Sequence, residues 1–200
     1  MLTSSLLLGC DPEYYPNTNT HINRLAIKDS KILLEKENNA SLLRAIELYE
    51  TPSLVSNKFD FETLKNIHFH LFQDIYDWAG IPRNYPVKKG FSIFTPPEDF
   101  ATAIPVVFSA VEEYKSEYKS KNDIVLLAKV FRLLNKFHPF PEGNGRTQRI
   151  FIRLLGHTKG WDLTFEKMPQ WEMVEICKQA HEMNLEPMNA LFERIMESID

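Results

Sequence analysis

Several features that mark particular classes of protein are missing or scarce in this 200-residue chain. Its 2 cysteines, Cys10 and Cys177, lie far apart without a partner motif, so a disulfide scaffold is not expected and a reducing compartment is. No apolar run is long enough to span a bilayer, which gives no reason to expect a membrane partner. The formal net charge of −4 and the lack of a basic stripe argue against a nucleic-acid partner.

The N-terminal stretch MLTSSLLLGC superficially resembles a lipoprotein cleavage site that ends at Cys10. A secretory signal needs a basic segment and a longer apolar stretch, and this stretch has neither. We therefore expect Cys10 to be an unmodified thiol. With 44% hydrophobic and 25% charged residues over 200 positions, the chain has the composition of one globular domain with a sizeable core.

The hydrophobic periodicity is mostly helical, and we predict an all-α fold with one small β-hairpin. Helices are expected over residues 29–50 (as one or two), 60–80, 95–118, 122–138, 144–159, 169–183 and 187–198. TPPE at 95–98 matches a capping box, with Thr95 at the N-cap and Glu98 three residues later. The segment RNYPVKKGFSIFT (83–95) breaks the helical pattern and alternates loosely around Lys89-Gly90, which predicts a hairpin or extended flap.

The stretch KFHPFPEGNGRTQR (136–149) combines residue types that bind phosphate and transfer protons. No lysine follows its glycines as in a P-loop, and the spacing is not the dinucleotide G-x-G-x-x-G. Gly143-Asn144-Gly145 precedes a predicted helix, so its backbone N–H groups can form an anion-binding nest at the positive helix end. His138 is expected at the end of the preceding helix, where the chain turns.

The side chains around this nest complete a chemical site. Arg146 and Arg149 are three residues apart on one helix face, and both can bind phosphate oxygens. Glu142 can hold a magnesium ion on those phosphates, and His138 is a candidate general base. Each part alone is more often structural, since a lone buried histidine or a pair of surface arginines is common. Their conjunction within so few residues predicts nucleotidyl or phosphoryl transfer.

The stretch HPFPEGNGRTQR resembles the Fic signature, His-Pro-Phe-x-(Asp/Glu)-Gly-Asn-Gly-Arg-x-x-Arg, at every specified position. The similarity to bacterial Fic toxins extends to YYPNTNTHINRLAIKD (14–29), IHFHLFQDIYDWAG (67–80) and the flap KKGFSIFTPPEDF (88–100). It therefore covers about residues 14–160. The resemblance implies a single Fic domain over 1–200, with 161–200 as its C-terminal helices.

The resemblance also implies an activity, the transfer of AMP from ATP to a Tyr, Thr or Ser hydroxyl of a target protein. His138 would deprotonate that hydroxyl, Glu142 would bind Mg²⁺, and Phe140 would be an apolar anchor. The nucleotide would be held by the Gly143, Asn144 and Gly145 nest, by Arg146 near the β-phosphate and by Arg149 at the γ-phosphate. The flap would dock the target by strand addition, through Lys89, Gly90, Phe91, Ser92, Ile93 and Phe94.

Two alternatives to AMP transfer remain. The same motif could transfer UMP, phosphocholine or phosphate, or remove AMP; the presence of Gly145 and Arg149, instead of the Lys-containing kinase-type motif, favours AMP transfer. The second is a helical binding module that binds nucleotide without catalysis. Among the other histidines, His68 and His70 are two apart on a predicted helix and make a poor metal pair, and the rest have no partner cluster.

Many Fic proteins are inhibited by a helix with the pattern Ser/Thr-x-x-x-Glu-Gly/Asn, whose glutamate pairs with the second motif arginine. In this sequence only Ser109 and Glu113 have that spacing, and Tyr114 follows them. We therefore expect inhibition by a separate small antitoxin protein. We place the chain in the bacterial cytoplasm and leave translocation into a host cell open.

Overall fold

The computed structural model describes residues 13–90, 92–181 and 184–199, so the predictions for Cys10 and Phe91 lie outside it. The α-helices in the described ranges are α1 (Ser30–Glu50), α2 (Phe61–Phe72), α3 (Phe100–Ser116), α4 (Asp123–Phe137), α5 (Asn144–His157), α6 (Gln170–His181) and α7 (Glu186–Ile195). The strands are β1 (Lys88–Lys89), β2 (Ser92–Ile93), β3 (Trp161–Leu163) and β4 (Met196–Ser198). The predicted helical fold with a small hairpin is confirmed.

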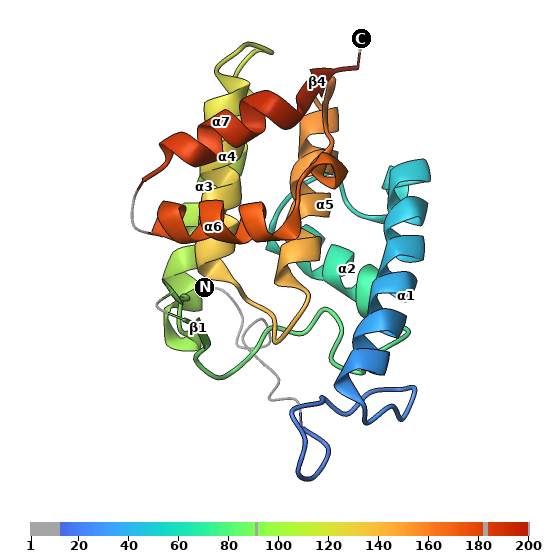
Figure 1. Cartoon of the computed structure of the whole chain (residues 1–200). Coiled ribbons are helices and arrows are strands. Elements are labelled where there is room, and N and C mark those ends of the chain that lie inside the picture. The colour runs from blue at the N-terminus through green and yellow to red at the C-terminus, as the bar shows by residue number, and fades with distance from the viewer. Residues whose placement is uncertain (1–12, 91, 182–183, 200) are drawn as a thin grey trace.

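Helix α4 lies at the centre and contacts α3, α5, α6 and α7. Its apolar face is buried, with Leu127, Phe131 and Leu134 at most 2% exposed. Helix α2 packs between α1 and α5, and Figure 1 shows α1 (blue) standing on the far side of α5 from α4. The chain between α4 and α5 turns at one end of this bundle, close to the flap formed by β1 and β2 (Figure 1).

Helix α2 ends at Phe72, eight residues before the predicted end at Gly80. The N–H groups of Ile75 and Tyr76 both bond to the Phe72 carbonyl, and the chain continues in turns. Tyr76 and Trp78 stack with ring centroids 4.1 Å apart, and both rings are buried. Packing of these aromatic rings therefore overrides the helical spacing of the sequence beyond Phe72.

The capping box predicted at 95–98 is wrong. Helix α3 begins at Phe100 after a short 3₁₀ turn at Pro97–Asp99, and no side chain caps either segment. The Thr95 hydroxyl instead donates to the carbonyl of Lys136, at 3.1 Å. The N–H of Thr95 bonds to the same carbonyl, so this residue ties the end of the flap to the last turn of α4.

A second small sheet was not predicted. The last predicted helix ends at Ile195, and Met196–Ser198 form β4, which pairs antiparallel with β3. The helix predicted over 144–159 ends at His157, and Gly160 (φ +71°) closes the turn into β3. The partner strands lie more than thirty residues apart in sequence, so local patterns carry no signal for this pairing.

Candidate active site

The turn between α4 and α5 carries the predicted motif. His138 follows α4 directly in a left-handed conformation (φ 45°, ψ 58°), and its N–H bonds to the Leu134 carbonyl at 3.0 Å. This conformation ends the helix and redirects the chain toward α5. The prediction that His138 stands at the end of a buried helix, where the chain turns, is confirmed.

Gly143 is the residue at which the turn becomes a helix. Its φ is +77°, which disfavours any residue with a side chain, and an added Cβ would lie 2.4 Å from the Phe72 ring. The first turn of α5 leaves its N–H groups without intrahelical acceptors until Thr147, whose N–H bonds to the Gly143 carbonyl. These amides form the positive end of a helix, as a phosphate site requires.

The Asn144 side chain fixes the shape of the loop. Its Oδ1 accepts from the Phe140 N–H at 2.9 Å, and its Nδ2 donates to the Phe140 carbonyl at 2.7 Å. Asn144 is 5% and Phe140 1% exposed, so this pair of hydrogen bonds is shielded from water. Phe140 is thus an internal anchor. Because the side chain of Asn144 bonds within the protein, it is the Asn144 backbone N–H that can face a ligand.

The flap covers His138. The Phe94 ring stacks on the imidazole with centroids 3.8 Å apart, and both residues are buried. Arg83 holds them together, because its Nε donates to the His138 carbonyl at 2.9 Å and its Nη2 donates to the Thr95 carbonyl at 2.7 Å. Its Nη1 bonds to the carbonyl of Tyr85 on the other side of the flap. One buried arginine therefore links both ends of the flap to the predicted base.

Glu142 lies beside the nest with a half-exposed carboxylate. Its Oε1 accepts from the Gly143 N–H at 2.9 Å, and its Oε2 lies 3.8 Å from the Nζ of Lys89 in the flap. Across residues 13–90, 92–181 and 184–199, no group of three or more His, Cys, Asp or Glu side chains could hold a metal ion. Glu142 is the carboxylate of the motif, and a carboxylate of this kind suits Mg²⁺ when phosphates and water supply most of the other ligands.

The two motif arginines differ in their surroundings. Arg146 pairs with the buried Glu37 of α1, and its Nη1 donates to Asn38 and Ser41 of the same helix at 3.2 Å. These three contacts with described residues use three of the five N–H groups of Arg146, so its Nε–H and one Nη2–H can still donate to a ligand. Arg149 forms no ion pair with any described residue, and burial together with the nearby Arg146 charge lowers the pKa of its guanidinium. An anion bound at Arg149 would compensate this buried charge.

These groups surround one cavity of about 700 Å³. The motif residues His138, Glu142, Gly143, Gly145, Arg146 and Arg149 supply much of its polar lining. Its less polar lining includes Leu42, Tyr49, Met173 and Cys177. Burial raises the pKa of the Cys177 thiol to about 11, so this thiol is neutral near pH 7. Such a division suits a molecule with a phosphate tail and a flat apolar base.

The structure brings three flap residues to the same cavity. Lys89, Ser92 and Phe94 line it, whereas the side chain of Ile93 is 67% exposed on the outside of the hairpin. Gly90 adopts a φ of +60° at the tip of the flap. Within the described segments, no helix has the length and apolarity to cross a bilayer.

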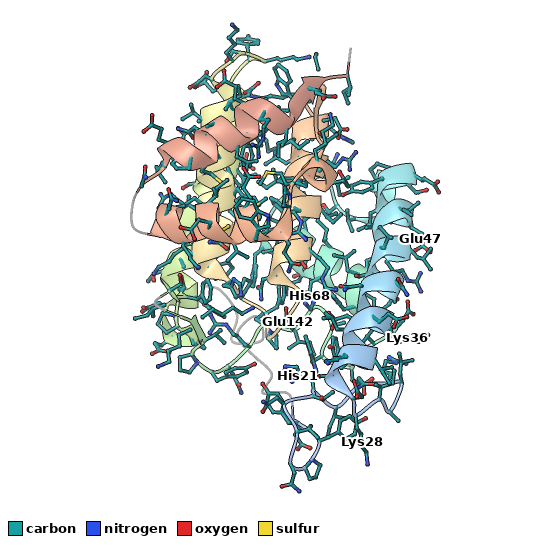
Figure 2. The ribbon with its side chains drawn as sticks, viewed as in Figure 1. His21, Lys28, Lys36, Glu47, His68 and Glu142 are labelled. Carbon is teal, nitrogen blue, oxygen red and sulfur yellow. The ribbon has the colours of Figure 1, made fainter. Side chains whose placement is uncertain are left out.

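His68, which its sequence spacing marked only as half of a poor metal pair, is fully buried beneath the loop. Its Nε2 lies 3.0 Å from the Glu142 carbonyl oxygen, and its Nδ1 accepts from the Gly80 N–H at 2.8 Å. Figure 2 shows His68 next to Glu142, at the end of α5 where the motif turns. Burial lowers the pKa of His68 to about 3. Its spacing from His70 excluded a metal pair but gave no signal for a contact with a loop 74 residues away.

The chain resembles known proteins both in sequence and in fold. Residues 58–155 match the model of the Fic/DOC family. The chain is 31% identical to a probable protein adenylyltransferase of Sinorhizobium fredii, covering 93% of this chain and 96% of that protein. It is 32% identical to the protein adenylyltransferase VbhT of Bartonella schoenbuchensis over 92% of this chain, but it spans only 38% of VbhT.

Solved structures agree with these relatives. The BepC protein of Bartonella tribocorum, a VirB-translocated effector with bound AMPPNP, superposes with a TM-score of 0.86 at 25% identity and covers 94% of this chain and 97% of its own. The N-terminal Fic domain of a Bartonella quintana protein with bound ADP gives a TM-score of 0.85 at 27% identity, over 92% and 94% of the two chains. Motif, matched length and fold lead to one conclusion: the chain belongs to the Fic/DOC family.

Proposed function

We propose that the chain is a protein adenylyltransferase that moves AMP from ATP to a Tyr, Thr or Ser hydroxyl of a target protein. The observation that carries the proposal is the shared cavity, whose lining includes a candidate base, a helix N-terminus and Arg149, which has no ion pair with a described residue. The names of the relatives support the donor and the reaction, because they include protein adenylyltransferases and Fic domains with bound AMPPNP or ADP.

In this proposal the target hydroxyl loses its proton to His138 as its oxygen attacks the α-phosphorus of ATP. A new oxygen–phosphorus bond forms, the bond from the α-phosphorus to the bridging oxygen breaks, and pyrophosphate leaves with its electrons. The Gly143–Gly145 amides hold the phosphates, and Arg149 stabilises charge at the γ-phosphate end. Arg146, fixed by Glu37, contributes its remaining N–H groups near the β-phosphate.

The reaction predicts which phosphate stays on the target. Incubation with ATP labelled at the α-phosphate should label a protein, whereas ATP labelled at the γ-phosphate should not. Label from the γ-phosphate alone would show a kinase and contradict the proposal. If UTP or a phosphocholine donor at equal concentration suppressed labelling by ATP, the alternative donors would be favoured. If the chain bound ATP but no label reached a protein, a non-catalytic module would be favoured.

Glu142 is expected to hold Mg²⁺, which would neutralise charge on the triphosphate. Glu142→Ala should therefore strongly reduce the rate of AMP transfer at low Mg²⁺ concentration. The rate should recover in part as the Mg²⁺ concentration is raised, because the loss of one ligand weakens metal binding. The measurement is the rate of AMP transfer across a Mg²⁺ titration. Lys89→Ala, which removes the cation 3.8 Å from this carboxylate, is the control and should leave the Mg²⁺ requirement in place. Equal Mg²⁺ dependence in the wild type and Glu142→Ala would assign the metal elsewhere.

The flap is proposed to present the target hydroxyl to His138. Among the described residues its two strands form a two-stranded sheet, in which Lys88 pairs with Ile93 and Lys89 with Ser92, so an extended target segment can add along the hairpin. Phe94 fixes the end of the flap against His138. Strand addition uses main-chain bonds, so it accepts target segments of varied sequence. We place this reaction in the bacterial cytoplasm, or in a host cell after translocation.

We also propose that a small antitoxin inhibits the chain by placing a glutamate on Arg149. The proposal is supported by the cavity lining, which includes Leu34 and Leu42 of α1 and Val174 of α6, each about half exposed or more, so an inhibitory helix could pack on these apolar side chains. Arg149 lacks a carboxylate partner among the described residues, and a bidentate glutamate would deny it to ATP.

This proposal predicts that no glutamate of the chain is itself the inhibitor. Glu113, which has the inhibitory spacing from Ser109, pairs with Lys129 at 2.6 Å and lies outside the cavity lining. Glu113→Gly should therefore leave self-modification with labelled ATP unchanged, and Glu193→Gly on α7 serves as a matched control. A tenfold or larger gain from either substitution would reveal an inhibitor within the chain.

A further inference from the structure

The hydrogen bonds of His68 define its tautomer. The Gly80 N–H can only donate, so Nδ1 accepts and carries no proton. The proton of the neutral ring is then on Nε2, which donates to the carbonyl oxygen of Glu142 at 3.0 Å. The ring is held from both sides, since a backbone amide of one segment and a backbone carbonyl of the motif loop are its two partners.

The ring plane is fixed as well. His68 stacks on Phe140 with centroids 3.9 Å apart and an interplanar angle of 18°, and Phe72 packs at 4.7 Å. Phe140 is in turn locked by the Asn144 side chain. His68 therefore contacts the motif loop at two points, through a stacked ring and through a hydrogen bond, and the ring cannot turn without breaking one of them.

The carbonyl of Glu142 belongs to the same peptide unit as the N–H of Gly143. In a trans peptide these two groups point in opposite directions, and the described residues contain no cis bond. Because the carbonyl points inward to His68, the Gly143 N–H points outward, where it meets the Glu142 carboxylate at 2.9 Å on the cavity side. The orientation of the first amide of the nest is thus set from the core.

We propose that His68 is a positioning residue for phosphate binding, which fixes the Glu142–Gly143 peptide with its N–H on the cavity side, where a phosphate oxygen can replace the Glu142 carboxylate as its acceptor. The proposal rests on the proposed function and deepens it, because it names the group that orients the phosphate loop. A buried histidine that merely fills the core would contribute to stability alone. A positioning residue must also affect ligands with phosphates more than ligands without them.

Two substitutions separate these roles. His68→Phe keeps an aromatic ring for stacking on Phe140 and removes both ring nitrogens, whereas His68→Gln keeps an N–H donor near the position of Nε2. The control is His70→Gln, two residues along the same helix, whose imidazole lies 3.1 Å from Glu47 of α1 and outside the cavity lining. Folded fraction is measured for each variant by thermal unfolding before binding is compared.

The readout is calorimetric binding of a non-hydrolysable ATP analogue and of adenosine. We expect His68→Phe to weaken binding of the ATP analogue roughly tenfold, by analogy with the loss of affinity when a residue that orients a metal ligand is removed. Adenosine binding should not change, His68→Gln should recover most of the loss, and His70→Gln should behave as wild type. If His68→Phe weakened binding of both ligands equally, or of neither, the positioning role would be overturned.

A second measurement does not depend on the variants or on turnover. Long-range ¹H–¹⁵N spectra of the wild-type histidine rings should show His68 with a bare Nδ1 and a protonated Nε2. The opposite tautomer would overturn the inference even if every variant fails to fold. A chain that binds the ATP analogue tightly but transfers no AMP would contradict the proposed function and leave the role of His68 in binding intact.

Discussion

Replacing His138 with alanine is expected to reduce AMP transfer by about 10²–10⁴ while ATP binding is retained. Among the described residues, the imidazole of His138 is the only histidine ring that lines the cavity, and the His138 backbone bonds to Arg83 and Leu134. The proposed phosphate ligands are backbone amides and arginines that do not depend on this side chain. Rates with labelled ATP, together with calorimetric ATP affinity, measure the two effects separately.

The matched control for this substitution is His157→Ala. His157 lies at the end of α5, outside the cavity lining, and its Nε2 is 2.8 Å from Asp162. Its loss should leave the rate of transfer near that of wild type. If His138→Ala turned over at a comparable rate, another group would be the base.

Gly143→Ala is expected to lower both stability and ATP affinity. The left-handed conformation alone costs a residue with a side chain about 1–2 kcal/mol. The new methyl group would also lie 2.4 Å from the buried Phe72 ring, so the turn must shift. A shift here moves the amides that are proposed to bind phosphate. For a chain of this size, each kcal/mol lost corresponds to a Tm lower by roughly 2–4 °C.

Gly145→Ala tests whether this effect is specific to position 143. A Cβ at Gly145 meets only the Nη1 of Arg149, at 3.4 Å, and the residue already lies in regular α5. We expect its Tm to stay near that of wild type, with a smaller loss of ATP affinity. If Gly143→Ala and Gly145→Ala lowered the Tm by the same amount, the explanation of the turn at Gly143 would be wrong.

The predictions that the structure confirms came from sequence patterns within a single segment of the chain. Periodicity predicted the helix that is α4, and the glycines before α5 predicted a turn into a helix. The contacts that position the site join segments far apart: Arg83 to His138, Glu37 to Arg146 and His68 to Glu142. These residues carry no local pattern, because their partners are backbone carbonyls or side chains chosen by tertiary packing. The early end of α2 has the same cause, since Tyr76 and Trp78 stack instead of continuing the helix.

The most direct test of AMP transfer is peptide mass spectrometry after the chain is incubated with ATP, Mg²⁺ and a bacterial or host-cell lysate. The account predicts peptides heavier by one AMP minus water, on a Tyr, Thr or Ser side chain, in the wild-type reaction and not with His138→Ala. Adducts that are phosphate alone, or AMP adducts that persist unchanged with His138→Ala, would contradict it.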